Sequence, residues 1–167
     1  MSDKELRHQL VRLLTVRQAH MDFEDAVKDF PMSEINTKLP NCDYTFWHVL
    51  EHIRICQIDI LEFIVSDNYK WLNFPDDLWP ARDAITTPEG WQQTIDQFFA
   101  DRQALVDVIN DPARDLFERL PNNRDKEINI LREIHTVASH NAYHTGEIGI
   151  ARHILGIWYE DRKGLID

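Results

Sequence analysis

Glycine and cysteine are both scarce in this chain. Five glycines among 167 residues are too few for the many tight turns of an all-β fold. The two cysteines, Cys42 and Cys56, form neither a disulfide framework nor a CxxC pair. We therefore predict reduced thiols and a cytoplasmic location.

Positive charge and long apolar runs are in short supply as well. Lys and Arg number 18 against 29 Asp and Glu, which gives a formal net charge of -11. Such an acidic chain repels nucleic-acid phosphates and anionic membranes, so we expect no nucleic acid and no membrane as a partner. The most apolar stretch, residues 49–65, is interrupted by charged side chains, and residues 1–7 lack the apolar core of a signal peptide.

Helical periodicity is what the sequence does have. Apolar residues recur at three- and four-residue spacing in four segments, and no segment alternates as a strand would. The predicted helices run from about residue 2 or 3 to 29, from 43 or 45 to 66, from 86 to 110 and from 125 to 156. Thr86 and Glu89 have the spacing of a capping box, and Gly156 suits a helix end. We expect one all-α domain over residues 1–167.

The connections between these helices are long. The predicted fold is a four-helix bundle, and connections of this length permit a topology other than simple up-down-up-down. One of them, residues 68–83, is rich in aromatic side chains. It can cover the bundle end as a lid or pack as a purely structural loop, and the structural role is the commoner one.

Two histidines on the last predicted helix, His140 and His144, carry the main chemical signal. Residues four apart lie about 40° from each other around a helix, so both imidazoles point the same way, one turn apart. They lie at the edge of an apolar stripe that includes Val137 and Ile148. A pair placed in this way either binds a metal ion or forms two hydrogen-bonded core histidines.

A third imidazole would complete a site with an open coordination position, as in catalytic zinc sites. His52, at the edge of the apolar stripe of the second predicted helix, is the best candidate. His48 is the alternative, because His48 and His52 are also four residues apart. Glu147 lies within about 20° of His140 on the helical wheel. It is a fourth ligand, a general base, an acceptor behind a ligand, or a surface glutamate.

Other metal chemistries fit the sequence less well. A ferritin-like di-iron site needs two Glu-x-x-His pairs, and only Glu5 and His8 have that spacing. Residues 48–52 match the HxxEH pattern of inverzincins, but that site would leave the pair on the last helix without a role. Cys56, one turn after His52, is interpreted as a small core residue.

The combination of these motifs resembles the DinB superfamily, also called the DinB/YfiT-like fold. Its pattern is a four-helix bundle with one histidine early in the second helix and HxxxH on the last long helix. The resemblance spans nearly the whole chain, including the Trp79-Pro80 loop. The matching stretches are Leu50-Glu51-His52 and Ala142-Tyr143-His144-Thr145-Gly146.

The resemblance implies one divalent metal ion, usually zinc or nickel, held by three histidines, which here are His52, His140 and His144. It also implies a homodimer. Characterised relatives include thiol-dependent enzymes, namely maleylpyruvate isomerase acting with mycothiol and bacillithiol transferases. The chain departs from the pattern at Glu147, where the family commonly has glutamine, and at His48, where one subgroup often has glutamine.

Two functional hypotheses follow. In the first, the protein is a metal-dependent enzyme in which the ion activates a water or a low-molecular-weight thiol toward a small-molecule substrate, with Glu147 as catalytic residue. The reaction would then be S-transfer or hydrolysis. In the second, it is a non-catalytic, stress-linked metal-binding bundle. An open coordination position favours the first, and a closed four-ligand site favours the second.

Overall fold

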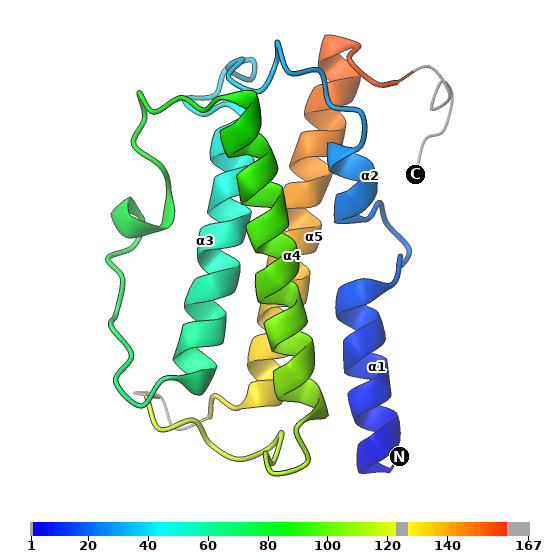
Figure 1. Cartoon of the computed structure of the whole chain (residues 1–167), viewed down its shortest axis with the longest axis vertical. Coiled ribbons are helices and arrows are strands. Elements are labelled where there is room, and N and C mark those ends of the chain that lie inside the picture. Colours follow the sequence, from blue (N-terminus) through cyan, green and yellow to red (C-terminus); the bar gives the residue numbers. More distant parts are fainter. Residues whose placement is uncertain (1, 123–126, 160–167) are drawn as a thin grey trace.

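The computed structural model describes residues 2–122 and 127–159 (Figure 1). The helices in this part of the chain are α1 (Asp3–Thr15), α2 (Phe23–Val27), α3 (Phe46–Val65), the 3-10 helix η1 (Asp76–Leu78), α4 (Pro88–Asn110) and α5 (Ile130–Leu155). The same residues contain two isolated β-bridges and no strand. The predicted all-α fold with four main helical segments is confirmed.

The bundle does not follow a simple up-and-down path. In Figure 1, α3 and α4 lie side by side and run in the same direction, whereas α1 and α5 run in the opposite direction. α3 packs against both α4 and α5. The connection over residues 66–87 returns along the length of α3 before α4 begins (Figure 1). This confirms the expectation that long connections permit another topology.

The prediction of one continuous first helix through residue 29 is wrong. α1 ends at Thr15, and α2 lies beyond it on the same side of the bundle (Figure 1). Gln18 Nε2 donates to the carbonyl of Val16 at 2.6 Å, and Asp22 Oδ1 accepts from the N–H of Asp25 at 2.8 Å. Such side chain–backbone bonds compete with a continuous helix, and the apolar spacing does not reveal them.

Two further helix boundaries differ from the prediction. The side chain that caps α4 belongs to Thr87, which accepts from Gly90 N–H at 3.2 Å, and not to Thr86. α5 begins after its cap Asn129, and the predicted start at residue 125 lies outside the described residues. Gly156 ends α5 in the left-handed conformation with φ 67°, as expected for a glycine at this position.

The core consists of two apolar halves with polar residues between them. One half includes Phe23, Phe46, Ile53, Phe98 and Ile148. The other includes Leu10, Leu61, Leu105, Ile134 and Val137. Apart from Cys56, the buried side chains that lie between these positions along α3, α4 and α5 are polar: Gln57, Asp101, His144 and Thr145. A buried polar layer is stable only when its groups are hydrogen-bonded or bind a ligand.

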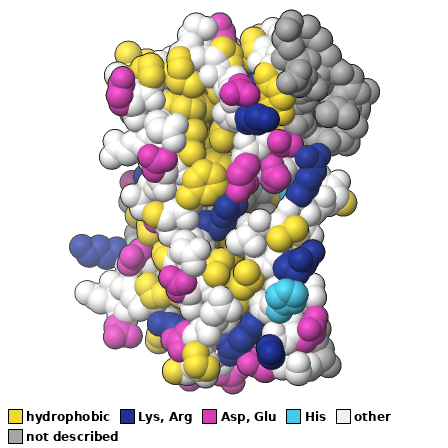
Figure 2. All heavy atoms as spheres, turned by 45° about the vertical axis from the view of Figure 1, so that its right-hand side comes forward, with side chains coloured by type: hydrophobic (Ala, Val, Ile, Leu, Met, Phe, Trp, Pro, Cys, Tyr) yellow, Lys and Arg dark blue, Asp and Glu magenta, His cyan; other side chains and the backbone are white. Residues whose placement is uncertain are grey.

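The surface has no single-signed patch on the face shown in Figure 2, where acidic and basic side chains are interspersed. Several charged side chains of the protein pair, as in Arg7 with Asp3 and Arg102 with Glu24, at 2.7 and 2.6 Å. Among the described residues, no helix is long and apolar enough to cross a membrane.

Arg152 joins α5 to α2 from a fully buried position. Its guanidinium donates to the carbonyls of Ala26 and Lys28 at 2.8 and 2.9 Å, and it lies over the Trp158 ring at 4.1 Å from the centroid. The positive charge thus meets the negative end of a helix dipole. This contact fixes α2 on the bundle although α2 has only five residues.

Replacing Arg152 by methionine should lower the free energy of unfolding by about 3 kcal/mol or more, because several buried carbonyls lose their donor. Urea unfolding followed by circular dichroism measures this loss. Arg12→Met, at an exposed position of α1, is the matched control and should change stability by less than about 0.5 kcal/mol. Equal effects of the two substitutions would contradict the anchoring role of Arg152.

Candidate metal centre

His52 enters the core from the second turn of α3, which begins after the Thr45 cap. The imidazole is 5% exposed, and its Nδ1 lies 2.7 Å from the carbonyl oxygen of Leu78. Because a carbonyl only accepts, Nδ1 carries the proton and Nε2 keeps a free lone pair. Trp79 stacks on the ring at 3.8 Å between centroids and 6° between planes, which fixes the ring plane as well.

His140 and His144 approach His52 from α5, one helical turn apart. Their ring centroids lie 4.5 Å from each other. Nδ1 of His144 lies 2.7 Å from Oε2 of Glu147. A carboxylate accepts this proton, so His144 also presents Nε2 as a bare nitrogen. Nε2 of His140 lies 3.2 Å from Nε2 of His52.

The three imidazoles form one cluster. One ring nitrogen from each of His52, His140 and His144 lies within 4.8 Å of the others, and in the described part of the chain this is the one such group of potential metal ligands. Ring nitrogens gathered so closely could together hold one metal ion. The donor set therefore fits a divalent metal and supplies three ligands.

Burial and neighbouring imidazoles favour the neutral form of two of these histidines, His140 and His52. Burial, and then the neighbouring His144 and His52, lower the pKa of His140 from 6.5 to about 4. Burial also lowers the pKa of His52. Neutral imidazole is the form that binds metals, so at neutral pH few protons compete for the site.

His48, the alternative third ligand, has a structural role instead. The ring Nδ1 of His48 accepts from the backbone N–H of Thr45 at 3.2 Å. The backbone N–H of His48 donates to Thr45 Oγ1 at 3.2 Å, which completes a capping box. Its Nε2 then carries the proton and donates to the carbonyl of Ala84 at 2.9 Å. With both nitrogens engaged and 2% exposure, His48 has no lone pair to offer. The HxxEH interpretation loses its first ligand.

Glu147 and Cys56 touch the cluster from outside. Glu147 accepts from His144 Nδ1, so of the possibilities raised by the sequence the geometry favours an acceptor behind a ligand. The predicted catalytic role of Glu147 stays a prediction. Cys56 Sγ lies 3.5 Å from His52 Nδ1, and burial raises the pKa of its thiol to about 12. It is a neutral core thiol, as the sequence indicated.

Three groups near the site were missed by sequence reasoning. The carbonyl of Leu78 carries no sequence signal, and Trp79 was visible as an aromatic residue of the long connection and in the Trp79-Pro80 resemblance, but its contact with His52 was not predicted. Tyr44 lies beside Trp79, with ring centroids 5.4 Å apart and ring planes tilted by 33°. Its pKa is raised to about 12 by a hydrogen bond with Cys42, by burial and by the charge of Glu147. The phenol therefore stays protonated beside the site.

The two histidines of α3 should behave differently when replaced. His52→Ala removes a ligand and should abolish tight zinc binding, as measured by competition with a chromophoric chelator. His48→Ala should keep the zinc affinity and lower stability by roughly 1 kcal/mol, because it removes a cap and one further hydrogen bond. Equal losses of affinity would restore the HxxEH interpretation.

The lowered pKa of His140 predicts a pH dependence of stability in the metal-free protein. Between about pH 4 and 6.5 the unfolded chain binds more protons at this residue than the folded chain, so the free energy of unfolding falls as the pH falls through this window. His140→Asn removes this contribution. Urea midpoints measured from pH 4 to 7.5 should fall less steeply in the variant, and parallel curves would contradict the assignment.

Comparison with known proteins agrees with this geometry. The family model described as the DinB superfamily matches residues 15–148, which include α3, α4 and the three clustered histidines. Searches of curated proteins and of solved structures gave no significant match. Because the matched range covers most of the sequence and contains the complete histidine cluster, the chain belongs to the DinB superfamily.

Proposed function

We propose that the protein is a metal-dependent enzyme that carries one divalent ion, zinc or nickel, on His52, His140 and His144. The observation that carries this proposal is the convergence of three imidazoles, two of which have their Nδ1 proton held by an acceptor behind the ring. When bound, such an ion lowers the pKa of a water or a low-molecular-weight thiol and so supplies a nucleophile for hydrolysis or S-transfer.

The residues around the cluster support an enzyme better than a closed structural site. The described residues bring together three histidine ligands and no fourth, which leaves a coordination position for a reactant. A cavity of about 520 Å³ has Tyr44 and Trp79 in its wall; Trp79 stacks on His52 and separates the cavity from the cluster, whose three histidines do not line it. Its size suits a small molecule. The protonated Tyr44 phenol can donate a hydrogen bond there.

Glu147 has two possible contributions in this proposal. Through His144 Nδ1 it holds the ring in one orientation and raises its basicity as a ligand. As the catalytic residue predicted from the sequence, it would also take a proton from the water or thiol. The homodimer and the cytoplasmic location expected from the sequence also stay predictions.

One experiment separates these possibilities. Metal content, and turnover with a low-molecular-weight thiol plus an electrophile or with an ester, are measured for wild type, His144→Ala and Glu147→Gln. Wild type should carry about one zinc or nickel per chain and show turnover, and His144→Ala should lose both. Glutamine keeps an acceptor for His144, so Glu147→Gln should retain the metal. A base role then predicts turnover lowered about 100-fold or more.

Each contrary outcome has a definite meaning. Failure of the untagged wild type to bind zinc or nickel would overturn the proposal. One bound metal without turnover in either reaction class would support the non-catalytic metal-binding alternative. Unchanged turnover in Glu147→Gln would remove the base role, and a loss of metal in that variant would make Glu147 important for the site itself.

A further inference from the structure

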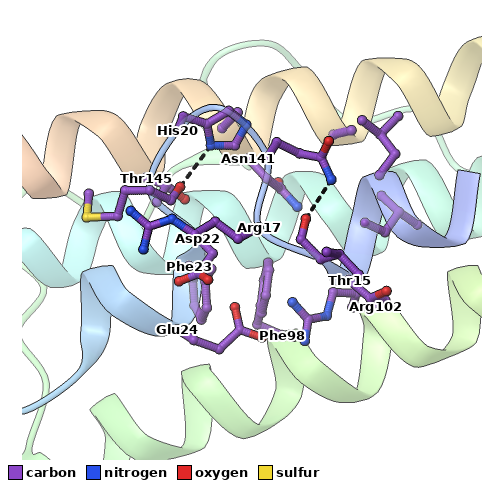
Figure 3. A pocket seen from close by; sticks show the side chains of 17 residues that line it. Thr15, Arg17, His20, Asp22, Phe23, Glu24, Phe98, Arg102, Asn141 and Thr145 are labelled. Atoms are coloured by element: carbon purple, nitrogen blue, oxygen red, sulfur yellow. Dashed lines mark hydrogen bonds and ion pairs between the residues drawn. The ribbon is translucent and has the colours of Figure 1, made fainter. Parts of the chain in front are cut away.

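A cavity of about 520 Å³ lies between the start of α3 and the connection that follows α3, and it is lined by residues from the ranges 43–48 and 75–82. We call it the Trp79 cavity. Figure 3 shows another cavity, between the α1–α2 connection, α4 and α5, whose volume is about 60 Å³. That volume holds only a few water molecules, whereas the Trp79 cavity has the size of a small-molecule site.

The apolar part of the wall of the Trp79 cavity is formed by Tyr44, Pro75, Trp79 and Pro80. One face of the Trp79 indole is stacked on His52, with 3.8 Å between the ring centroids, so the opposite face is the one left for a ligand. The Tyr44 ring lies beside this indole, with centroids 5.4 Å apart and planes tilted by 33°. Both aromatic residues are partly exposed. The faces of aromatic rings carry partial negative charge and attract cations.

The charged residues of the wall are two carboxylates and one guanidinium, those of Asp43, Asp76 and Arg82. Arg82 Nη1 lies 3.2 Å from Asp43 Oδ2, so these two charges largely offset each other. Asp76 makes no ion pair within the part of the chain that the structure describes. His48, also in the wall, has both ring nitrogens in hydrogen bonds with backbone groups. The wall therefore carries a surplus of negative charge, which attracts cations and repels anions.

Two other classes of ligand fit this wall less well. An anion needs hydrogen-bond donors, and the Arg82 side chain is 87% exposed and already paired with a carboxylate. A wholly apolar ligand would cover the rings and prolines, but it would bring Asp76 against an apolar surface without a counter-charge. A cation with an apolar body interacts favourably with both parts of the wall.

We propose that the Trp79 cavity binds a small organic cation, namely an ammonium compound with an apolar body. The ammonium group lies against the open face of Trp79, beside Tyr44, with its charge toward Asp76. The apolar body covers the prolines and displaces water from them. This ligand lies on the opposite side of the indole from His52. The inference therefore goes beyond the proposed function and does not require a bound metal.

Benzylamine is the probe that tests this inference, because its ammonium group is charged at neutral pH and its ring is apolar. Benzyl alcohol has nearly the same shape without the charge, and benzoate carries a negative charge. Binding to the zinc-free protein at low ionic strength is followed by the ¹H–¹⁵N signal of the Trp79 indole, which Trp79→Phe identifies among the five tryptophans. Benzylamine should bind about 10-fold more tightly than benzyl alcohol, and benzoate should not bind. Added salt should weaken the binding of benzylamine alone.

Two substitutions separate the contribution of the ring from that of the charge. Tyr44→Leu keeps the wall apolar and removes an aromatic face, and Asp76→Asn removes the carboxylate that has no ion pair. Each should weaken the binding of benzylamine roughly 3- to 10-fold and should change the affinity for benzyl alcohol much less. If Tyr44→Leu does not fold, Asp76→Asn still tests the inference, because Asp76 is exposed.

The matched controls lie on the same connection but outside this cavity. Tyr69→Leu removes a tyrosine that lines a different cavity, and Asp83→Asn removes an exposed carboxylate. Neither control should change the affinity for any of the three probes. Thermal unfolding followed by circular dichroism checks that each variant is folded.

Three results would overturn the inference. Equal binding of benzylamine and benzyl alcohol would leave no role for a cation, and the absence of any shift of the Trp79 indole signal would exclude the cavity as the site. Equal weakening by Asp83→Asn and Asp76→Asn would assign the attraction to the overall negative charge of the chain. Failure of the protein to bind zinc would overturn the proposed function alone, because these titrations use zinc-free protein.

Discussion

Two of the three imidazoles at the centre of this bundle, those of His52 and His144, are oriented by an acceptor behind the ring. An imidazole has two nitrogens, and its lone pair points to the site only when the proton is held on the far side. The acceptors come from different parts of the chain: a backbone carbonyl at Leu78 for His52 and a carboxylate at Glu147 for His144. The connection 66–87 is thus as much a part of the site as the helices.

This requirement also shapes the packing of the core. The buried polar groups near the histidines interrupt the apolar packing. They divide the core into two halves, each of which resembles a separate small core. Each half holds the helices in register on its own side of the layer. Gln57 and Asn141 then bridge α3, α4 and α5 across the gap, and the geometry of the layer is set by apolar packing above and below it.

The parts of this arrangement that could be predicted from the sequence are those that depend on the spacing of residues along a helix. His140 and His144 follow from the HxxxH interval, and the position of His52 on its apolar stripe favoured it over His48. The reason His48 is excluded is a capping bond to Thr45, which depends on one rotamer and leaves no periodic signal. The break after α1 was missed for the same reason. Backbone acceptors such as the carbonyl of Leu78 have no side chain to read and become visible only in the folded chain.

The connection between α3 and α4 is longer than the parallel arrangement of these two helices requires. α3 has 20 residues and is therefore about 30 Å long, a distance that about nine extended residues can span. Residues 66–87 are more than twice as many. The surplus contacts α3 through η1, and its Trp79 covers His52. Because this connection lies outside the long helices, a change in its length or composition would change what covers the histidine cluster while the packing of the long helices stays the same.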